Sequence, residues 1–278
     1  MFLDIPLDNS DSKDEVADWV ELHAIFEENE VSKTEVNSAI EDWKGSEPEE
    51  SFINDVWLEL ERREFLYGEK PPFTVASSVI VPKIKWEDNP EYLMCLLLSI
   101  FGNPEDTTAT GKLFERLSGE AIKNYLGGHI IIYGHPSKQN VNDIAKALCE
   151  RFNFQPSSNF KDRGLDVIGW KSFEDRRPSQ VIVLFQCAAG HNWKSKLHEL
   201  PIEAWCKYIA WGYDPIKGFS LPQIVSHEEF EECSFAAGVL MDRARIYRNT
   251  FNHDLGDELR DQIRTWCCNK ISALRTES

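Results

Sequence analysis

The feature that most constrains the fold of this chain is a pair of apolar runs within residues 164–196, GLDVIGWKSFEDRRPSQVIVLFQCAAGHNWKSK. The runs at about 165–170 and 180–187 are rich in β-branched and aromatic residues and predict two successive strands. The second run ends on the side-chain amide of Gln186, which a strand in an apolar core does not need. The pair is either an ordinary buried hairpin that ends in polar residues or part of a site that includes Asp166 and Gln186.

Helical patterns surround this strand pair and set the class of fold. Apolar residues recur at helical spacing before and after it, and the segment 129–136 predicts a further short strand. Because helices and strands alternate through the middle of the chain, the sequence predicts an α/β core with helices added at both ends. The expected helices are two within 14–44 and others at about 51–66, 92–102, 110–128, 140–154, 201–214, 226–251 and 257–274, and 71–86 is expected to be extended.

Charge is distributed unevenly along the chain. The whole sequence has 47 acidic and 30 basic residues, which gives a formal net charge of −17 at pH 7. Residues 1–70 hold 21 of the acids and 6 of the bases, a net charge of −15, so the rest of the chain carries −2. This asymmetry predicts modules with different roles. We expect an acidic helical module at 1–87, a core at 88–220 and a C-terminal helical module at 221–278.

The N-terminal module has the predicted order helix, helix, helix and strand, which suits a small helical or winged-helix-like unit. Such a unit can bind DNA, or it can bind or pack against protein. Contacts to nucleic-acid phosphates depend on lysine and arginine, whereas this module is strongly acidic. The sequence therefore favours protein interaction, and it predicts a protein partner or a homo-oligomer formed through this module.

The composition also indicates the cellular compartment of the protein. No apolar run reaches the roughly 18–20 residues that a membrane-spanning helix needs. The first 15 residues lack a basic segment followed by an apolar stretch, which a signal peptide has. The seven cysteines form no CxxC pair and are expected to be reduced thiols. These features predict a cytoplasmic protein that has no membrane partner.

Polar residues that can carry chemistry follow one another in an informative order. Glu115 lies on an expected helix, Asp166 lies at the first strand of the pair, and Gln186 ends the second strand. Lys194 and Lys196 follow on an expected helix. Hydrolysis of a phosphodiester requires that charge on the transition state be neutralised and that a water be activated, and a cation held by hard oxygen ligands does both. Neighbouring strands, about 4.8 Å apart, can bring such ligands together.

This order resembles the PD-(D/E)XK, or restriction-endonuclease-like, superfamily over about residues 108–215. It resembles in particular the Mrr-type branch, in which the second acidic position is often glutamine. The resemblance implies an α-β-β-β-α-β core and a site for Mg²⁺ or Mn²⁺. The implied metal ligands are Asp166, Gln186, the backbone carbonyl of Cys187 and, as an accessory ligand, Glu115. A lysine is implied as the group that stabilises negative charge developing on the transition state.

The sequence departs from the family pattern at one position. The family's lysine normally comes two positions after the second acidic residue, where this chain has Ala188. Either Lys194 or Lys196 reaches back from the following helix, or the site is inactive. His191 would share a helical face with Lys194, and it is a candidate general base or accessory metal ligand.

A second basic cluster lies near the C-terminus. Arg243, Arg245 and Arg248 fall within one expected helix, and Arg245 and Arg248 share a face of it. These side chains either contact the backbone of DNA or form ion pairs with the acidic N-terminal module.

The function expected from these features is metal-dependent endonucleolytic cleavage of DNA. The resemblance implies a setting in bacterial restriction or anti-phage defence, and the acidic module predicts regulation by a protein partner. The alternative is a catalytically inactive nuclease-fold subunit that acts as a scaffold in a multiprotein defence complex, which Ala188 favours. A third class, a regulatory nucleic-acid binder without chemistry, would bind DNA in a salt-dependent manner that ignores metals.

Overall fold

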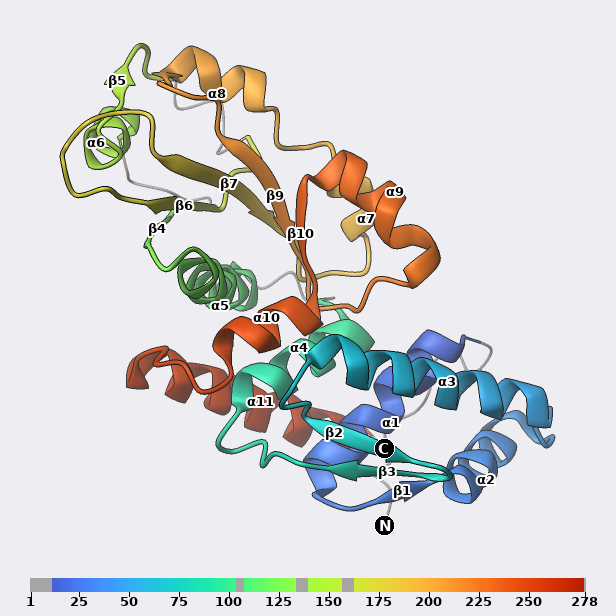
Figure 1. The fold of residues 1–278 in the computed structure, drawn as a ribbon. Coiled ribbons are helices and arrows are strands. Elements are labelled where there is room, and N and C mark those ends of the chain that lie inside the picture. The colour runs from blue at the N-terminus through green and yellow to red at the C-terminus, as the bar shows by residue number, and fades with distance from the viewer. Residues whose placement is uncertain (1–11, 104–107, 134–139, 157–162, 278) are drawn as a thin grey trace. The chain divides into compact units, whose positions relative to one another are not determined.

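The chain forms two compact units, described here from a computed structural model (Figure 1). The structure describes residues 12–103, 108–133, 140–156 and 163–277. Among the helices of these residues, none combines the length and the apolar character needed to cross a bilayer. Unit 1 contains residues 1–102, 243–251 and 256–278, and unit 2 contains residues 103–242 and 252–255.

Unit 1 combines N-terminal helices and a small sheet with the last two helices of the chain. The strands form an antiparallel sheet in the order β1-β3-β2. Ser32 and Glu35 open α2 as a capping box, because each side chain accepts a hydrogen bond from the other's main-chain N–H. The elements are α1 (Lys13–Glu27), β1 (Val31–Ser32), α2 (Lys33–Lys44), α3 (Glu50–Tyr67), β2 (Phe73–Ala76), β3 (Val79–Pro82), α4 (Pro90–Phe101), α10 (Arg243–Thr250) and α11 (Asp257–Glu277).

Two buried arginines join the helices of unit 1. Arg63 of α3 lies 2.5 Å from Asp18 and 2.8 Å from Glu21, which are both on α1. Arg243 of α10 lies 2.6 Å from Asp18 and 3.3 Å from Glu21. Burial by itself raises the pKa of Asp18, but the guanidinium groups of Arg243 and Arg63 lower it to about 2. Charge therefore ties α10 to α1, although Arg243 and Asp18 are 225 residues apart in the chain.

Unit 2 is built on a mixed five-stranded sheet in the order β10-β9-β7-β6-β4. The neighbours β4, β6 and β7 are antiparallel, and β9 and β10 continue parallel to β7. Helices supply the crossover connections that parallel strands need. The predicted α/β class is thus confirmed. The elements are α5 (Thr108–Leu126), β4 (His129–Ile132), α6 (Val141–Ala147), β5 (Arg151–Phe152), β6 (Val167–Lys171), β7 (Val181–Cys187), α7 (Trp193–Lys196), α8 (Ile202–Tyr208), β8 (Ile209–Ala210), β9 (Ile216–Ser220), α9 (His227–Ala237) and β10 (Val239–Met241).

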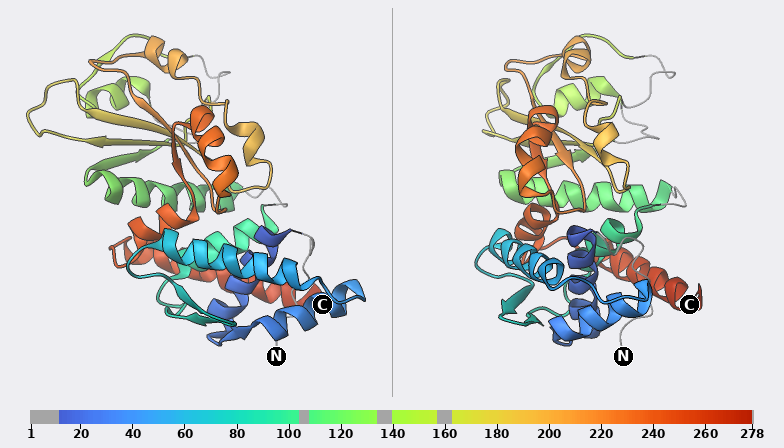
Figure 2. Two further views of the ribbon diagram at one scale, coloured as in Figure 1. Left: turned by 45° about the vertical axis from the view of Figure 1, so that its right-hand side comes forward. Right: turned by 90° about the vertical axis from the view of Figure 1, so that its right-hand side faces the viewer.

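Helix α5 lies against one face of this sheet at close range (Figure 2, green helix). Glycines on both sides permit the approach. A Cβ atom on Gly119 of α5 would lie 2.6 Å from Ile132, and a Cβ atom on Gly169 of β6 would lie 2.8 Å from Ile122. Because no side chain separates the two surfaces at these points, α5 carries its polar residues close to the sheet.

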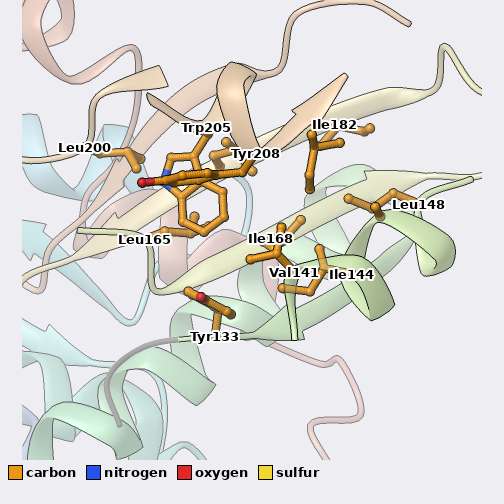
Figure 3. Close-up of a cluster of buried hydrophobic side chains, with 13 residues drawn as sticks. Tyr133, Val141, Ile144, Leu148, Leu165, Ile168, Ile182, Leu200, Trp205 and Tyr208 are labelled. Atoms are coloured by element: carbon orange, nitrogen blue, oxygen red, sulfur yellow. The ribbon is translucent and has the colours of Figure 1, made fainter. Parts of the chain in front are cut away.

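The opposite face of the sheet carries a large apolar core. Figure 3 shows side chains of β6 and β7 packed between α6 and α8. Burying these aliphatic and aromatic side chains is the main favourable term for this half of unit 2. The buried members of the cluster are Tyr133, Val141, Ile144, Ala145, Leu148, Leu165, Ile168, Ile182, Leu184, Leu200, Trp205, Tyr208 and Ile209.

Some helices are shorter than the sequence predicts. The helix expected over 226–251 is wrong, because α9 stops before Gly238, which has a positive φ of 75°, and β10 separates it from α10. The helices expected over 140–154 and 201–214 end early and are followed by β5 and β8, which pair with each other. Strands of two or three residues give too short a pattern to be seen in the sequence.

The units also group the chain differently from the expected segments 1–87, 88–220 and 221–278. Helix α4 belongs to unit 1, where it packs against α1, α10 and α11 and is buried on nearly all sides, as its apolar sequence predicts. Helix α9 and strand β10 belong to unit 2, because β10 completes its sheet. The division follows spatial pairing of distant segments, which composition along the chain does not reveal.

Candidate functional site

Asp166 lies immediately before β6, at a kink in the main chain. Its N–H donates to the Phe185 carbonyl at 2.9 Å, and its own carbonyl accepts from the Tyr133 N–H at 2.7 Å. In a regular antiparallel ladder both groups of one residue face the same neighbouring strand, so this pattern marks a bulge-like break, a device that re-aims side chains. The Asp166 carboxylate accepts a hydrogen bond from the Cys187 N–H at 2.7 Å. Asp166 is thereby held at the end of β7.

Gln186 is the second-last residue of β7 and is buried, with 4 % of its surface exposed. Its Nε2 donates to Glu199 Oε2 at 2.8 Å. Its Oε1 is buried and has no hydrogen-bond partner within the part of the chain that the structure describes. A buried amide oxygen without a partner costs about 1–3 kcal/mol, so this atom is suited to accept a ligand or a water.

Cys187 lies on the other side of β7 from Gln186, because successive side chains of a strand alternate. Burial raises the pKa of the Cys187 thiol well above its usual value, and the carboxylates of Asp166 and Glu115 raise it further. Both carboxylates therefore act on the thiol at the end of β7. Glu115 also forms an ion pair of 2.8 Å with Lys112, one turn earlier on α5.

A pair of hydroxyl groups fixes α5 at this point. The hydroxyls of Ser118 on α5 and Ser220 on β9 are 2.8 Å apart, and both residues are fully buried. Ser118 is also hydrogen-bonded to the Cys187 thiol. Three elements of unit 2, α5, β7 and β9, therefore meet at Ser118, one turn after Glu115 on α5.

The two candidate lysines have different surroundings. Lys194 forms an ion pair of 2.6 Å with Glu229 of α9, and its side chain is 56 % exposed. Lys196 is half-buried, and its carbonyl accepts from the Glu199 N–H at 3.0 Å. Lys196 is the last residue of α7 and begins the turn to Glu199, which contacts Gln186 of β7, whereas the Lys194 side chain is paired with α9.

At position 188, where the PD-(D/E)XK pattern has a lysine, both the side chain and its surroundings are apolar. Ala188 is buried, with 2 % of its surface exposed. It packs in a cluster that also contains Trp193, Leu197, Phe219 and Leu240. This environment disfavours a charged group, so any lysine that serves the site must enter from outside the strand.

The remaining candidates are exposed in unit 2 or belong to unit 1. His191 is exposed in the turn before α7. Arg243 is fully buried in unit 1 by its ion pairs with α1 and is therefore not accessible to a nucleic-acid backbone. Arg245 and Arg248 are exposed on α10, in unit 1 rather than in unit 2.

We call Asp166, Gln186, Glu199 and the main chain of Cys187 the strand-end site. It offers carboxylate and amide oxygens, which are the ligands that Mg²⁺ and Mn²⁺ prefer, and the partnerless Gln186 oxygen fits such an ion. Within the described ranges, no group of three His, Cys, Asp or Glu side chains is arranged to hold a metal. An ion at this position would have few protein ligands, so most of its coordination would come from waters, which Mg²⁺ tolerates.

Sequence reasoning did not find Glu199. The residue lies beyond α7 in a stretch without periodic pattern, and only the hydrogen bond to Gln186 reveals it. In comparisons with protein families, curated proteins and solved structures, no family model, protein or structure matched the chain.

Proposed function

We propose that unit 2 is a metal-dependent nuclease that hydrolyses phosphodiester bonds of DNA. The observation that carries the proposal is the hydrogen bond from the Cys187 N–H to the Asp166 carboxylate, which holds this acid beside Gln186 at the end of β7. The order α5-β4-β6-β7-α8-β9, with short elements inserted, also follows the α-β-β-β-α-β order that the resemblance to PD-(D/E)XK nucleases implies.

The residues of the strand-end site have separate roles in this proposal. Asp166 and Gln186 would hold Mg²⁺ or Mn²⁺, with Glu199 as a further oxygen donor and Glu115 as an accessory acid. The bound ion would supply charge neutralisation and an activated water. The Cys187 N–H orients the Asp166 carboxylate. Lys196, rather than Lys194, stabilises negative charge that develops on the phosphate.

The proposed setting is the cytoplasm of a cell that uses the enzyme in restriction or anti-phage defence, under the control of a protein partner. All seven cysteines are free thiols in the structure, which suits a reducing compartment. The setting itself rests on the family resemblance.

Cleavage of plasmid DNA tests the proposal. With Mg²⁺ or Mn²⁺ present, Asp166→Asn and Lys196→Ala are each expected to lower the cleavage rate by roughly 100-fold or more. Lys194→Ala serves as the matched control, because its ammonium group is paired with Glu229, and it should retain the wild-type rate. Cleavage that survives Asp166→Asn would refute the site, and a loss with Lys194→Ala alone would assign the role to the other lysine.

A non-catalytic scaffold subunit is the second candidate, and one observation favours it. The position of the family's lysine is an alanine that is enclosed by apolar side chains. A scaffold would cleave neither plasmid nor single-stranded DNA nor RNA with either metal, and Asp166→Asn would leave its assembly with a partner unchanged. A regulatory nucleic-acid binder would differ from both, because its DNA binding would weaken with salt and would not respond to metal.

A further inference from the structure

Helix α3 of unit 1 exposes two large apolar side chains. Leu58 is 61 % exposed and Phe65 is 83 % exposed, the highest value for a large apolar side chain in the described part of the chain. The two residues are seven positions apart, which is close to two helical turns, so they lie on one face of α3. The opposite side of the helix carries buried residues such as Val56 and Leu60. A single exposed leucine needs no explanation, but an aligned pair forms a stripe.

Acidic side chains border this stripe. Asp55 and Glu61 are exposed and precede Leu58 and Phe65 by three and four positions, so they share the same face. Arg62, which follows Glu61 on the same helix, contacts Glu59 through two hydrogen bonds of 2.7 Å. We call the surface formed by Asp55, Leu58, Glu61 and Phe65 the α3 face. Its apolar centre has negative flanks.

The chemistry of the α3 face excludes two kinds of partner. A helix that reads DNA in the major groove presents arginine, lysine, asparagine or glutamine to the base edges and needs cations for the phosphates. The α3 face presents carboxylates instead. A second copy of the chain would bring the same carboxylates, and the first 70 residues already carry a net charge of −15. Like charges brought together in this way oppose self-association.

We propose that the α3 face is the docking surface for a cationic amphipathic helix of a partner protein. Apolar residues of that helix would cover Leu58 and Phe65, and its lysines or arginines would lie against Asp55 and Glu61. Charge complementarity speeds encounter and selects the partner, while burial of the aromatic side chain supplies most of the affinity. The inference is independent of the nuclease proposal, because every residue of the α3 face lies in unit 1.

The experiment measures binding of a synthetic helical peptide made of leucine and lysine, with the leucines on one face, to the full chain by fluorescence anisotropy. A peptide with glutamate in place of every lysine is the matched control. We expect the lysine peptide to bind and the glutamate peptide to bind at least about tenfold more weakly, a difference of about one hot-spot contact. Higher salt should weaken binding of the lysine peptide.

Variants assign the binding to α3. Phe65→Ser and Leu58→Ser are each expected to weaken binding of the lysine peptide by about tenfold or more. The double charge reversal Asp55→Lys with Glu61→Lys should shift the preference toward the glutamate peptide. All four positions are exposed, so the fold should tolerate the changes. Phe235→Ser, which alters a side chain that is 80 % exposed on α9 in unit 2, should bind as the wild type does.

Several results would overturn the inference. They are the absence of binding by the lysine peptide, equal binding of both peptides, and unchanged binding by Phe65→Ser. Sedimentation of the free chain adds a further check, because a dimer that Phe65→Ser dissociates would show that a second copy covers the face. Salt-dependent binding of duplex DNA that is lost in Phe65→Ser would also contradict a protein partner.

Discussion

Charged and polar side chains gather in both units, but the two regions hold them in opposite ways. In unit 1, Arg63 and Arg243 are almost completely buried, and each contacts both Asp18 and Glu21. In the strand-end site of unit 2, a main-chain N–H holds the key carboxylate, and the Gln186 oxygen lacks a partner among the described residues. In the first region each of these four charges has partners of opposite charge, so we call it the closed cluster, although Arg243 Nη1 has no hydrogen-bond partner among the described residues. In the second region the Gln186 oxygen is available to a ligand.

Polar groups therefore stabilise the fold in unit 1, whereas in unit 2 they are placed where they could bind a ligand. A closed cluster of buried ions is costly to desolvate, and it specifies one arrangement of α1, α3 and α10 because every alternative leaves a charge without a partner. A buried amide oxygen without a hydrogen-bond partner raises the free energy of the folded state, and a bound ligand or water removes this cost. We therefore expect stability to depend on the cluster of unit 1 and function to depend on the strand-end site.

The largest expected effect comes from opening the closed cluster. Arg243→Met removes one of two cations and leaves Asp18 and Glu21 undercompensated in the interior, so the free energy of unfolding should fall by roughly 3–5 kcal/mol. Arg245→Met, two residues away on the exposed side of α10, is the matched control and should change it by less than about 0.5 kcal/mol. Urea unfolding measures both. Equal effects of the two variants would mean that the cluster does not stabilise the protein.

The next effect concerns the close packing of α5, the helix that carries Glu115, against the sheet of unit 2. Gly119→Ala places a Cβ atom 2.6 Å from Ile132, and such overpacking should destabilise unit 2 by about 1–3 kcal/mol. Gly111→Ala, on the same helix with no atom within 4 Å of the added Cβ, should instead stabilise by about 0.5–1 kcal/mol. Thermal unfolding of the pair separates close packing from helix propensity. A stabilising Gly119→Ala would show that α5 can move away from the sheet.

The next prediction concerns a buried histidine of unit 1, which makes the free energy of unfolding depend on pH. Burial lowers the pKa of His23 to about 3, below its ordinary value of 6.5, so the unfolded state binds the proton first as the pH falls. The contribution of neutral His23 is complete above pH 6.5 and is lost between pH 6.5 and about 3, at up to about 1.4 kcal/mol per pH unit. His23→Leu should flatten this part of the stability profile relative to wild type. Parallel profiles of the two proteins would contradict a buried neutral histidine.

The smallest expected change in stability lies in the strand-end site. Glu199→Gln keeps an acceptor for the Gln186 amide and removes an exposed charge, so the free energy of unfolding should change by less than about 0.5 kcal/mol. If the site holds a metal, the affinity for Mn²⁺ should nevertheless fall by about 10–100-fold. Isothermal titration with Mn²⁺ measures this difference. A large loss of stability with unchanged metal affinity would make Glu199 a structural residue.

Much of the fold was predictable from patterns that local interactions produce. Helices with long apolar stripes and caps, such as α2 with Ser32 and Glu35, were expected at nearly the observed bounds. The strands β6 and β7 were expected because β-branched and aromatic residues mark them. The three-residue strand β10 was not expected, because Gly238 ends a helix only through a backbone conformation that the sequence pattern did not reveal. No sequence pattern marked β9, and only the implied family order placed a strand after the helix expected at 201–214.

The candidate site was predictable in its residue types but not in its geometry. Asp166 and Gln186 stood out because they are polar at strand ends, and the structure places the Asp166 carboxylate on the Cys187 N–H at the end of β7. The kink that aims Asp166 at the Cys187 N–H depends on hydrogen bonds to two different strands. Glu199 joins the site through a turn that has no periodic signal, so no reading of the sequence could have included it.

Four properties could be recognised before folding is considered, namely the α/β class, the acidity of the first 70 residues, the apolar character of α4 and the alanine at position 188. These are properties of composition and of short-range periodicity. Other contacts arise only on folding: Arg243 is buried against Asp18 and Glu21, Lys194 pairs with Glu229, and the Lys196 carbonyl accepts from the Glu199 N–H. The physical reason is that ion pairs and hydrogen bonds between distant segments depend on where packing of the core brings the chain, and that packing is a property of all the segments together.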